Sequence, residues 1–499
     1  MSVLGPTLQP TLDELSRPGR GGTRVPHPPA DALEGIPAAA HRVEPLALPE
    51  LDEPSVVRHF TNLSKLNYSV DTGCYPLGSC TMKYNPKLDE WGARLPGFAE
   101  LHPLAPDALA QGTLELLWEL EGLLAEIGGM AAVSLQPAAG AQGELTGILM
   151  IRAYHLARGD HGRSEVIVPD SAHGTNPATA SMAGFRTVTV PSAPDGGVDL
   201  EALRAALGPQ TAAVMITNPS TLGLFEARIV ELLEAVHAVG ALAYMDGANL
   251  NAIMGRFRPG QAGFDVMHFN THKTFSTPHG GGGPGAGPVG VAAPLVPFLP
   301  EPRVMREADG SFRLERPGER PSSIGRLRAG VGSTGVLVRA YAYIRAHGGT
   351  GLRQVSDDAV LAANYLRARL GEAYEIPYQR PCMHEFVATS RPLKAATGVR
   401  TLDVAKRLID KGFHPPTIYF PLIVEEAMLV EPTETEDLAT LDALAAAFVE
   451  IAGEARTDPE LVKSAPHEAP LRRLDEAAAA RQPDLRWRPM TGAQTPCPD

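Results

Sequence analysis

The sequence predicts an α/β protein with a mostly parallel central sheet, followed by a smaller α+β domain. Between about 160 and 291, short apolar runs alternate with stretches of helical pattern, as is typical of a parallel sheet. After about 335, longer helical stretches are joined by a few short extended pieces. The length of 499 residues, with 44% hydrophobic and 20% charged residues, fits a globular protein of two or three domains.

The first half of the chain supplies the elements of the predicted sheet domain. Residues 1–50 are rich in proline and glycine and predict an extended arm. Leucines at helical spacing predict a helix over 108–127, and a second helix follows Gly140 and runs to about 157. We expect strands at 166–168, 187–190, 213–216, 242–245 and 289–291, with helices near 199–207 and 228–239 between them.

The second half predicts the smaller domain. We expect helices at 335–347, 357–370 and 401–411 and extended pieces near 384–389 and 418–424. From 457 the chain is polar and proline-rich, which predicts a tail that is ordered only by packing on a neighbour. The expected division is therefore an arm (1–70), a large α/β domain (71–334), a small domain (335–456) and a tail (457–499).

Charge and cysteine content narrow the class of function. A net charge of −13 argues against a general nucleic-acid-binding surface. No secretory signal is visible at the amino terminus, and no apolar run is long enough to span a membrane. The cysteines, Cys74, Cys80, Cys382 and Cys497, form no C-x-x-C pair, so we expect a reduced, cytoplasmic protein.

Lys273 is the leading candidate for the chemistry. It lies in the polar segment 270–279, and the glycine-rich run 280–287 follows at once. Lysine amines form Schiff bases with carbonyl substrates and with pyridoxal phosphate. Glycine lets backbone approach a ligand closely, so this segment suits a lysine that meets an aldehyde in a confined pocket.

Two loops of the predicted sheet domain carry groups suited to a phosphorylated planar cofactor. Gly140, Ala141 and Gln142 open a helix, where free amides and the helix dipole favour a phosphate; a plain tight turn is the alternative. His173 follows the strand at 166–168 and is positioned to stack on a planar ring. A histidine hydrogen-bonded within its loop is the alternative for that residue.

Two more loops supply polar groups at strand ends. Asp246 follows the strand at 242–245 and precedes Lys273, as expected of the carboxylate that partners a pyridinium nitrogen. It could instead cap the next helix. The segment 217–221, which contains Asn218, follows the strand at 213–216 and is a candidate to hydrogen-bond the phenolic oxygen of the cofactor.

Two rival interpretations use the same part of the chain. His268, His272 and His279 suggest zinc, but their spacing matches no recognised ligand set, so we predict no metal site. The run 283–287 is not G-x-G-x-x-G and leads into no helix, which argues against a dinucleotide site.

Beyond these patterns, the chain closely resembles a known family over nearly its whole length: the pyridoxal-bearing P-protein subunit (subunit 2) of the two-chain glycine decarboxylase of the glycine cleavage system. The resemblance rests on the Lys273 segment and on segments 15–20, 75–86, 217–226, 244–252, 412–422 and 431–436. It implies the aspartate-aminotransferase-like fold (fold type I), with pyridoxal phosphate bound covalently at Lys273.

The resemblance also implies a reaction and partners. Glycine would be decarboxylated oxidatively, with release of CO₂ and transfer of its aminomethyl group to the lipoyl arm of the H-protein. A related first subunit that lacks the lysine would complete an assembly of two copies of each chain.

Within that implied site, Lys273 and His173 are the expected catalytic residues. The expected cofactor contacts are Asp246, Gly140, Ala141, Gln142, Asn218, Ala248, His272 and Thr334, the last at a subunit boundary. Arg326, Arg328 and Arg380 are candidates to bind the glycine carboxylate, and Cys74 and Cys80 are more simply two buried thiols than redox groups. Two alternatives stay open: another fold type I enzyme acting on a free small amino acid, or a non-catalytic partner subunit.

Overall fold

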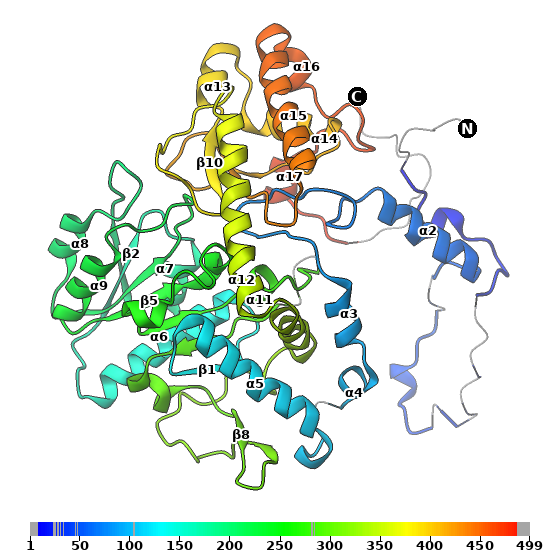
Figure 1. Cartoon of the computed structure of the whole chain (residues 1–499). Helices are drawn as coiled ribbons and strands as arrows, with labels where there is room; N and C mark the ends of the chain where they lie inside the picture. The colour runs from blue at the N-terminus through cyan, green and yellow to red at the C-terminus, as the bar shows by residue number, and fades with distance from the viewer. Residues whose placement is uncertain are drawn as a thin grey trace. The chain divides into compact units, whose positions relative to one another are not determined.

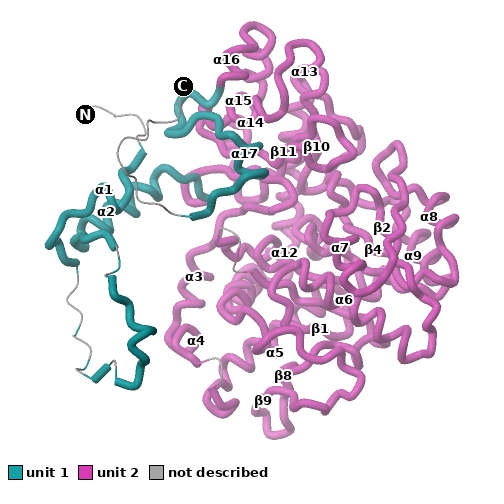
Figure 2. Tube along the Cα trace, turned by 180° about the vertical axis from the view of Figure 1, so that it is seen from behind, with its two compact units in different colours: residues 1–69, 465–499 teal, residues 70–464 magenta. Residues whose placement is uncertain are grey.

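The computed structural model describes residues 8–22, 26, 29, 31–32, 34–44, 46, 48–102, 105–280, 283 and 285–486. The chain forms two compact units, shown in Figure 2. One consists of residues 1–69 and 465–499, and the other of residues 70–464. Of the sequence features discussed above, Gly281, Gly282, Pro284 and Cys497 lie outside the described residues.

A seven-stranded sheet forms the centre of the 70–464 unit. Its strands, in spatial order, are β1 (Ala132–Ser134), β7 (Val289–Val291), β6 (Val266–His268), β5 (Leu242–Asp246), β4 (Thr211–Thr217), β2 (Glu165–Pro169) and β3 (Arg186–Val190). The five strands from β6 to β3 pair in parallel, and β7 is antiparallel to β6 and to β1. The predicted α/β class with a mostly parallel sheet is therefore confirmed.

All five predicted strands are present, with ends that differ by at most two residues. The prediction missed β1 and β6, each only three residues long. A three-residue strand is too short to show a period of its own, and these two are defined by pairing with β7 on either side. These two strands of the sheet could therefore be identified only from the tertiary structure.

Helices cover both faces of the sheet. Alternate residues of β4 point to opposite sides: Val214 packs in the cluster formed with α5 (Gln111–Gly128) and α9 (Ile229–Ala238), and Met215 in the cluster formed with α6 (Gly140–Ala157). The helix α7 (Thr175–Met182), which was not predicted, joins the α6 face, and α8 (Leu200–Ala206) joins the α5 face. Because both faces are covered, the inner strands β2, β4, β5 and β6 are almost wholly buried, as parallel sheets require, whereas the edge strand β3 buries only Val190.

Several short elements complete this region. They are α3 (Lys87–Ala93), α4 (Pro96–Ala99), η2 (Asp107–Leu109), η3 (Gly247–Ala252), α10 (Pro259–Ala262), α11 (Thr271–Thr274), η4 (Ala293–Phe298), β8 (Val304–Arg306) and β9 (Phe312–Leu314). The last two strands pair as a separate two-stranded sheet.

One helix connects the large sheet to the smaller C-terminal region, as Figure 1 shows. The sequence predicted separate helices at 335–347 and 357–370, and α12 (Thr334–Leu370) consists of two helical segments that meet at a kink. The interruption is a local kink at Gly348, where φ is 60° and ψ is −179°. Only glycine takes this conformation at little cost, so Gly348 allows the kink, and the second segment begins directly after it rather than at 357.

The C-terminal region is an antiparallel sheet covered by helices. Its strands lie in the order β10 (Phe386–Thr389), β12 (Ala427–Val430) and β11 (Thr417–Ile418). They pack with α13 (Arg391–Thr397), α14 (Thr401–Asp410), α15 (Leu438–Thr457) and α16 (Pro459–Lys463) around a second core. The prediction of an extended piece over 418–424 was wrong beyond Ile418, and β12 was missed.

The unit formed by residues 1–69 and 465–499 contains short helices. They are α1 (Leu12–Leu15), η1 (Ala38–Ala40), α2 (Glu53–Lys65) and α17 (Glu476–Arg481). The arm is therefore not wholly extended: Asp52 caps α2 by accepting from the amide of Ser55 at 2.8 Å. In α2, the apolar side chains of Val57, Phe60 and Leu63 are exposed, so this helix buries little apolar surface.

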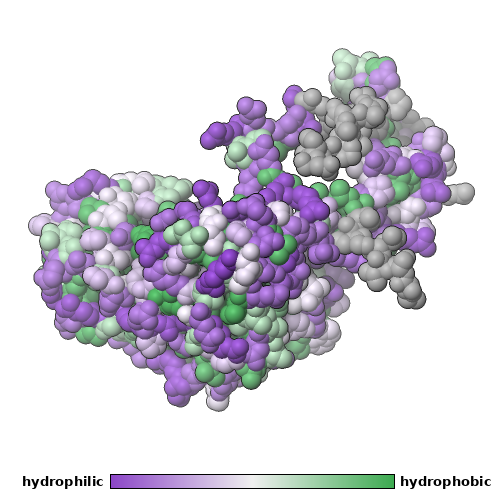
Figure 3. Space-filling model, turned by 90° about the horizontal axis from the view of Figure 1, so that it is seen from above, coloured by the Kyte–Doolittle hydropathy of each residue, from purple (hydrophilic) through white to green (hydrophobic). Residues whose placement is uncertain are grey.

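Among the described helices, none has the length and apolar character to cross a membrane. On the face shown in Figure 3, hydrophilic residues predominate and apolar residues occur in small groups.

Candidate active site

A cavity of about 220 Å³ lies where the parallel strands end. It is lined by Ser79, Ala139, Gly140, Ala141, Glu144, His173, Thr175, Thr217, Thr221, Asp246, Ala248, Asn249, His268, Asn270, His272 and Lys273. Many of these follow the carboxyl ends of β2, β4, β5 and β6, where ligands collect in sheets of this kind.

Lys273 reaches this cavity from the short helix α11. The helix begins directly after β6, and the amide of Lys273 donates to the carbonyl of Asn270 at 3.0 Å. In the part of the chain that the structure describes, the Nζ atom of Lys273 has no hydrogen-bond or ion-pair partner. Its amine is therefore free to react with a group in the cavity.

The amino end of α6 forms another wall of the cavity. Its N-cap, Ala139, provides no side-chain cap, and among the described residues nothing accepts a hydrogen bond from the amides of Gly140, Ala141 and Gln142. Free amides at the start of an 18-residue helix, with the positive end of its dipole, suit an anion such as phosphate. A Cβ atom on Gly140 would lie 2.4 Å from Oδ1 of Asn270, so the close fit requires glycine there.

Asp246 ends β5 and is buried in the cavity wall. Its Oδ1 accepts from the amide of Ala248 at 2.9 Å, and its Oδ2 accepts from Nδ2 of Asn176 at 3.1 Å. Burial disfavours the charged carboxylate. The interaction with His268, these two hydrogen bonds and the charge of Lys273 outweigh burial, however, and keep the pKa of Asp246 below its ordinary value. Asp246 therefore presents a negative charge to the cavity.

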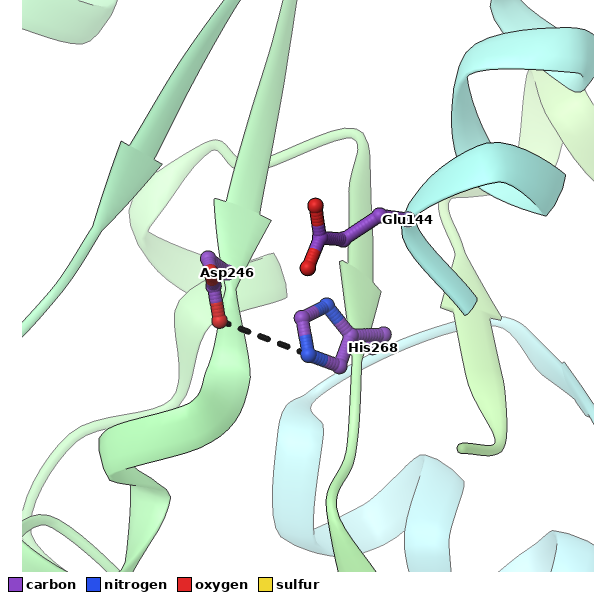
Figure 4. A group of neighbouring side chains, drawn as sticks. All are labelled: Glu144, Asp246 and His268. Carbon is purple, nitrogen blue, oxygen red and sulfur yellow. Dashed lines mark ion pairs between the residues drawn. The ribbon is translucent and has the colours of Figure 1, made fainter. Parts of the chain in front are cut away.

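Glu144 lies beside Asp246, as Figure 4 shows. It points from α6 toward Asp246 and His268, and the ligand atoms of the three side chains lie within 4.8 Å of one another. Its Oε1 accepts from the hydroxyl of Thr175 at 2.8 Å, and its Oε2 accepts from Nδ2 of Asn176 at 3.0 Å. Burial and the charge of Asp246 raise the pKa of Glu144 to about 7, so Glu144 is partly protonated at neutral pH beside the ionised Asp246.

His173 lies in the loop after β2 and is exposed at the cavity. Its Nδ1 accepts from the amide of Thr175 at 3.3 Å, and its ring meets that of Phe420 edge-on, with centroids 5.8 Å apart. Burial lowers the pKa of His173, as does Lys273, while Asp246 raises it; the overall effect is a decrease. A neutral ring at the cavity suits contact with a flat ligand.

The three histidines that were considered as zinc ligands do not lie together in one group. His272 and His279 contact each other edge-on at 5.3 Å, whereas His268 lies beside Glu144 and Asp246. Burial and the neighbouring charges lower the pKa of His272 to about 3 and that of His279 to about 4. His272 lines the cavity as a neutral side chain.

Three predicted cofactor contacts do not line the cavity. The side chain of Gln142 folds back and accepts from the amide of Ala138 at 2.6 Å. Asn218 is buried and accepts from the amide of Glu226 at 3.1 Å. Thr334 begins α12.

The candidate carboxylate-binding arginines are also absent from the lining. Arg328 donates to the hydroxyl of Ser333 at 3.1 Å, and Arg380 pairs with Asp195 at 3.2 Å; Arg326 is exposed. Of the described cysteines, Cys74 and Cys382 are buried, and burial raises the pKa of each thiol. Burial also raises the pKa of the Cys80 thiol, although the charge of Lys273 opposes it.

Of the predicted segment 217–221, Thr217 and Thr221 line the cavity. Sequence reasoning did not assign six other residues of the wall: Ser79, Glu144, Thr175, Asn249, His268 and Asn270. For two of these residues, the sequence did contain a signal that could have placed them at the site. Glu144 lies one helical turn after Gly140, and Asn249 follows Asp246 in the same short segment. Ser79 comes from a distant part of the chain, and no local pattern connects it to the sheet.

Two family models match separate parts of the chain. The model described as the glycine dehydrogenase C-terminal domain matches residues 355–472. The model described as aminotransferase class-V matches residues 147–282, which include α6, Asp246 and Lys273.

Solved structures show the same fold. A glycine decarboxylase (P-protein) of the glycine cleavage system, in inhibitor-bound form, has a TM-score of 0.71 at 23% identity, covering 84% of this chain and 94% of its own. The cysteine desulfurase CsdA from Escherichia coli has a TM-score of 0.59 at 17% identity, covering 77% of this chain and 95% of its own. The fold is therefore the predicted fold type I.

Curated relatives match at much higher identity. A probable glycine dehydrogenase (decarboxylating) subunit 2 from Halalkalibacterium halodurans is 56% identical over 97% of this chain and 99% of its own length. One of the same description from Methylococcus capsulatus is 56% identical over 95% of this chain and 98% of its own. With matches of this identity along almost the whole length, the chain belongs to the family of glycine dehydrogenase (decarboxylating) subunit 2.

Proposed function

We propose that this chain decarboxylates glycine oxidatively with pyridoxal phosphate as cofactor, and passes the aminomethyl group to the lipoyl arm of an H-protein. The activity is that of an aminomethyl-transferring glycine dehydrogenase. The observation that carries the proposal is the placement of Lys273 and Asp246 on one cavity with the uncapped amino end of α6. Family membership supports the same reaction.

The residues present fit this cofactor at each of its functional groups. Lys273 would hold its aldehyde carbon covalently, and the free amides of Gly140, Ala141 and Gln142 would hold its phosphate. Asp246 would face the ring nitrogen, and His173 would cover a ring face. Ala248 and His272 also line the cavity and would contact it. When bound, pyridoxal phosphate supplies an electron sink for the electron pair left when CO₂ departs.

Side chains of the cavity would act before and after the departure of CO₂. Asp246 keeps its negative charge through hydrogen bonds from Ala248 and Asn176, and so can hold a proton on a ring nitrogen. The amine of Lys273, when it does not hold the cofactor, would accept or donate a proton in the cavity. Thr217 and Thr221 add hydroxyl groups to the same wall.

The proposed partners follow from the family. We propose a related first subunit, in an assembly of two copies of each chain, with Thr334 as a cofactor contact that such an assembly would bring to the site. The lipoylated H-protein would deliver the disulfide that oxidises the aminomethyl group on transfer.

Isotope exchange tests the reaction directly. The chain, co-expressed with its first subunit and supplied with lipoylated H-protein, should incorporate labelled bicarbonate into the carboxyl carbon of glycine. A Lys273→Ala variant should lose the exchange and the pyridoxal absorption band, while the exposed control Lys65→Ala should keep both. A verified complex with a pyridoxal band but no exchange would refute the glycine reaction and leave another fold type I activity.

A further inference from the structure

Two buried glutamates lie behind the cavity wall, outside the cofactor contacts described above. Glu385 directly precedes β10, and Glu431 directly follows β12. Because β10 and β12 pair antiparallel with Phe386 opposite Val430, the two glutamates extend the register as facing residues. Both are completely buried, and their carboxyl oxygens and a ring nitrogen of His384 lie within 4.8 Å of one another. Like charges facing each other across strands are destabilising, and burial makes this worse.

Each glutamate holds one residue of the wall segment 79–81. Oε2 of Glu385 accepts from the amide of Ser79 at 2.7 Å, and Oε2 of Glu431 accepts from the amide of Thr81 at 3.0 Å. Ser79 and Thr81 have positive φ, 65° and 47°, although neither is glycine. Such conformations persist only where the surroundings hold them. The two carboxyl groups therefore fix a strained turn that puts Ser79 into the cavity wall.

Glu385 also reaches a second wall residue. Its Oε1 accepts from Nδ2 of Asn249 at 3.2 Å, so both of its oxygens already receive a hydrogen bond. On Glu431, Oε1 has no hydrogen-bond partner among the described residues. A single proton on the pair thus has one free position, Oε1 of Glu431.

From this geometry we propose that Glu385 and Glu431 share one proton, carried by Glu431, and act together as positioning residues that hold Ser79 and Asn249 in the wall of the cavity. The inference rests on the proposed function only for its activity measurement. A second ionised carboxylate at this place would repel the first and loosen the turn at 79–81.

The surrounding charges are consistent with one shared proton. Burial and the charge of Glu431 raise the pKa of Glu385 well above its ordinary value, and burial raises the pKa of Glu431 to about 7. Lys273 opposes both increases, and Glu434 adds to that of Glu431. His384 does not supply the missing charge, since burial and the charges of Lys273 and Lys83 lower its pKa to about 3. The thiol of Cys80 faces the same pair.

A bound cation would be the other way to compensate two buried carboxylates. His384 and Glu431 offer free ligand atoms, but both oxygens of Glu385 already accept N–H groups, and the charge of Lys273 acts on all three residues. These contacts favour a proton over a metal ion.

Two amide substitutions separate the glutamates. In Glu431→Gln, the side-chain carbonyl can still accept from Thr81 while the NH₂ group takes the place of the proton, so exchange activity should stay within about threefold of wild type. In Glu385→Gln, the NH₂ group must face either the amide of Ser79 or Nδ2 of Asn249, so activity should fall about tenfold or more. Glu372→Gln, at an exposed position, is the control.

The shared proton can be detected without any measurement of enzyme activity. Infrared difference spectra of the assembled protein should show the carbonyl stretch of a buried protonated carboxyl group at neutral pH, which disappears as the pH rises and is absent from Glu431→Gln. The alkaline loss of exchange activity that accompanies it should also be absent from that variant.

Three outcomes would overturn the inference: no such band in the wild type, a Glu431→Gln variant that fails to fold or loses activity as Glu385→Gln does, or a stoichiometric metal ion that is lost in Glu431→Gln. Absence of glycine exchange in the wild type would refute the proposed function instead, and the infrared band would still decide on the shared proton.

Discussion

Oδ1 of Asp246 lies 3.3 Å from Nε2 of His268, and both side chains are buried in the cavity wall. Burial lowers the pKa of His268 in spite of its acidic neighbour, so its ring is neutral at neutral pH. The other ring nitrogen, Nδ1, lies 2.7 Å from the hydroxyl of Tyr244, which fixes the ring. His268 therefore orients Asp246 without cancelling its charge, and that charge remains available to a cationic ligand group.

Removal of that charge should abolish most of the proposed activity. We expect Asp246→Asn to lower glycine–bicarbonate exchange by about 100-fold or more, the usual scale for loss of a buried electrostatic contact in an active site. Exchange rates and the pyridoxal absorption spectrum measure it, with the exposed Asp195→Asn as control. Equal activity in the two variants would remove Asp246 from the proposed mechanism.

The start of α6 should tolerate no side chain beyond glycine at Gly140. In Gly140→Ala, the new Cβ would approach Oδ1 of Asn270 to 2.4 Å, so one wall of the anion site must move. We expect affinity for pyridoxal phosphate to fall about tenfold or more, equivalent to about 1.4 kcal/mol. Gly122→Ala, at an open position of α5, should leave that affinity unchanged, and titration of cofactor into the apoprotein compares the two. Unchanged affinity in Gly140→Ala would move the phosphate site elsewhere.

For retention of the cofactor, the flat ring of His173 should matter more than any hydrogen bond from its nitrogen atoms. If it covers a flat cofactor, His173→Phe should keep most of the bound pyridoxal, whereas His173→Ala should retain it about tenfold less tightly. Dialysis followed by absorption spectroscopy measures the retention. Loss in both variants to the same degree would point instead to a hydrogen bond from the imidazole.

Glu144 should make the stability of the protein depend on pH. Its pKa in the folded protein is about 7, above its ordinary value of 4.5. The folded state therefore binds a proton that the unfolded state releases, and stability is lost as the pH rises from about 4.5 to about 7. Glu144→Gln should remove this loss, which amounts to at most about 3 kcal/mol.

Denaturant unfolding of the apoprotein at several pH values tests the effect. The curves of wild type and Glu144→Gln should diverge across this pH interval, while the exposed control Glu115→Gln should follow the wild type. Parallel curves for all three would show that Glu144 is ionised in the fold.

Two lysine–carboxylate pairs with similar distances should differ in their effect on stability. Nζ of Lys83 lies 2.7 Å from Oε1 of Glu434, and both side chains are buried. Nζ of Lys87 lies 2.8 Å from Oδ1 of Asp71, where the side chains are 61% and 54% exposed. Lys83→Met leaves a buried carboxylate without its partner and should lower the free energy of unfolding by about 3–5 kcal/mol.

For comparison, Lys87→Met should change that free energy by less than about 1 kcal/mol. Adding Glu434→Gln to Lys83→Met should restore part of the loss, because it removes the unpaired charge. Similar values for the two single variants would mean that Glu434 is neutral in the fold.

The sequence was sufficient to predict elements and site residues whose pattern lies within one short segment. The α/β class follows from five apolar runs alternating with helices, and the helix from Gly140 to about 157 is present as Gly140–Ala157. Lys273, Asp246 and the start of α6 were selected from their own short segments, and the fold places all three on one cavity. Local selection works here because the carboxyl ends of parallel strands meet at one edge of a sheet.

The tertiary structure decided what depends on distant partners. The short strands β1 and β6 exist through pairing with β7, and Ser79 enters the cavity wall because Glu385, 306 positions along the chain, holds its amide. Asn218 and Gln142, chosen by their positions in the sequence, turn their side chains to other backbone groups instead. The sequence by itself determined the family, the fold class and the leading candidates for the chemistry. Which buried carboxyl groups face each other was decided by folding, because only the folded chain brings Glu144 to Asp246 and Glu385 to Glu431 and removes the water that would separate their charges.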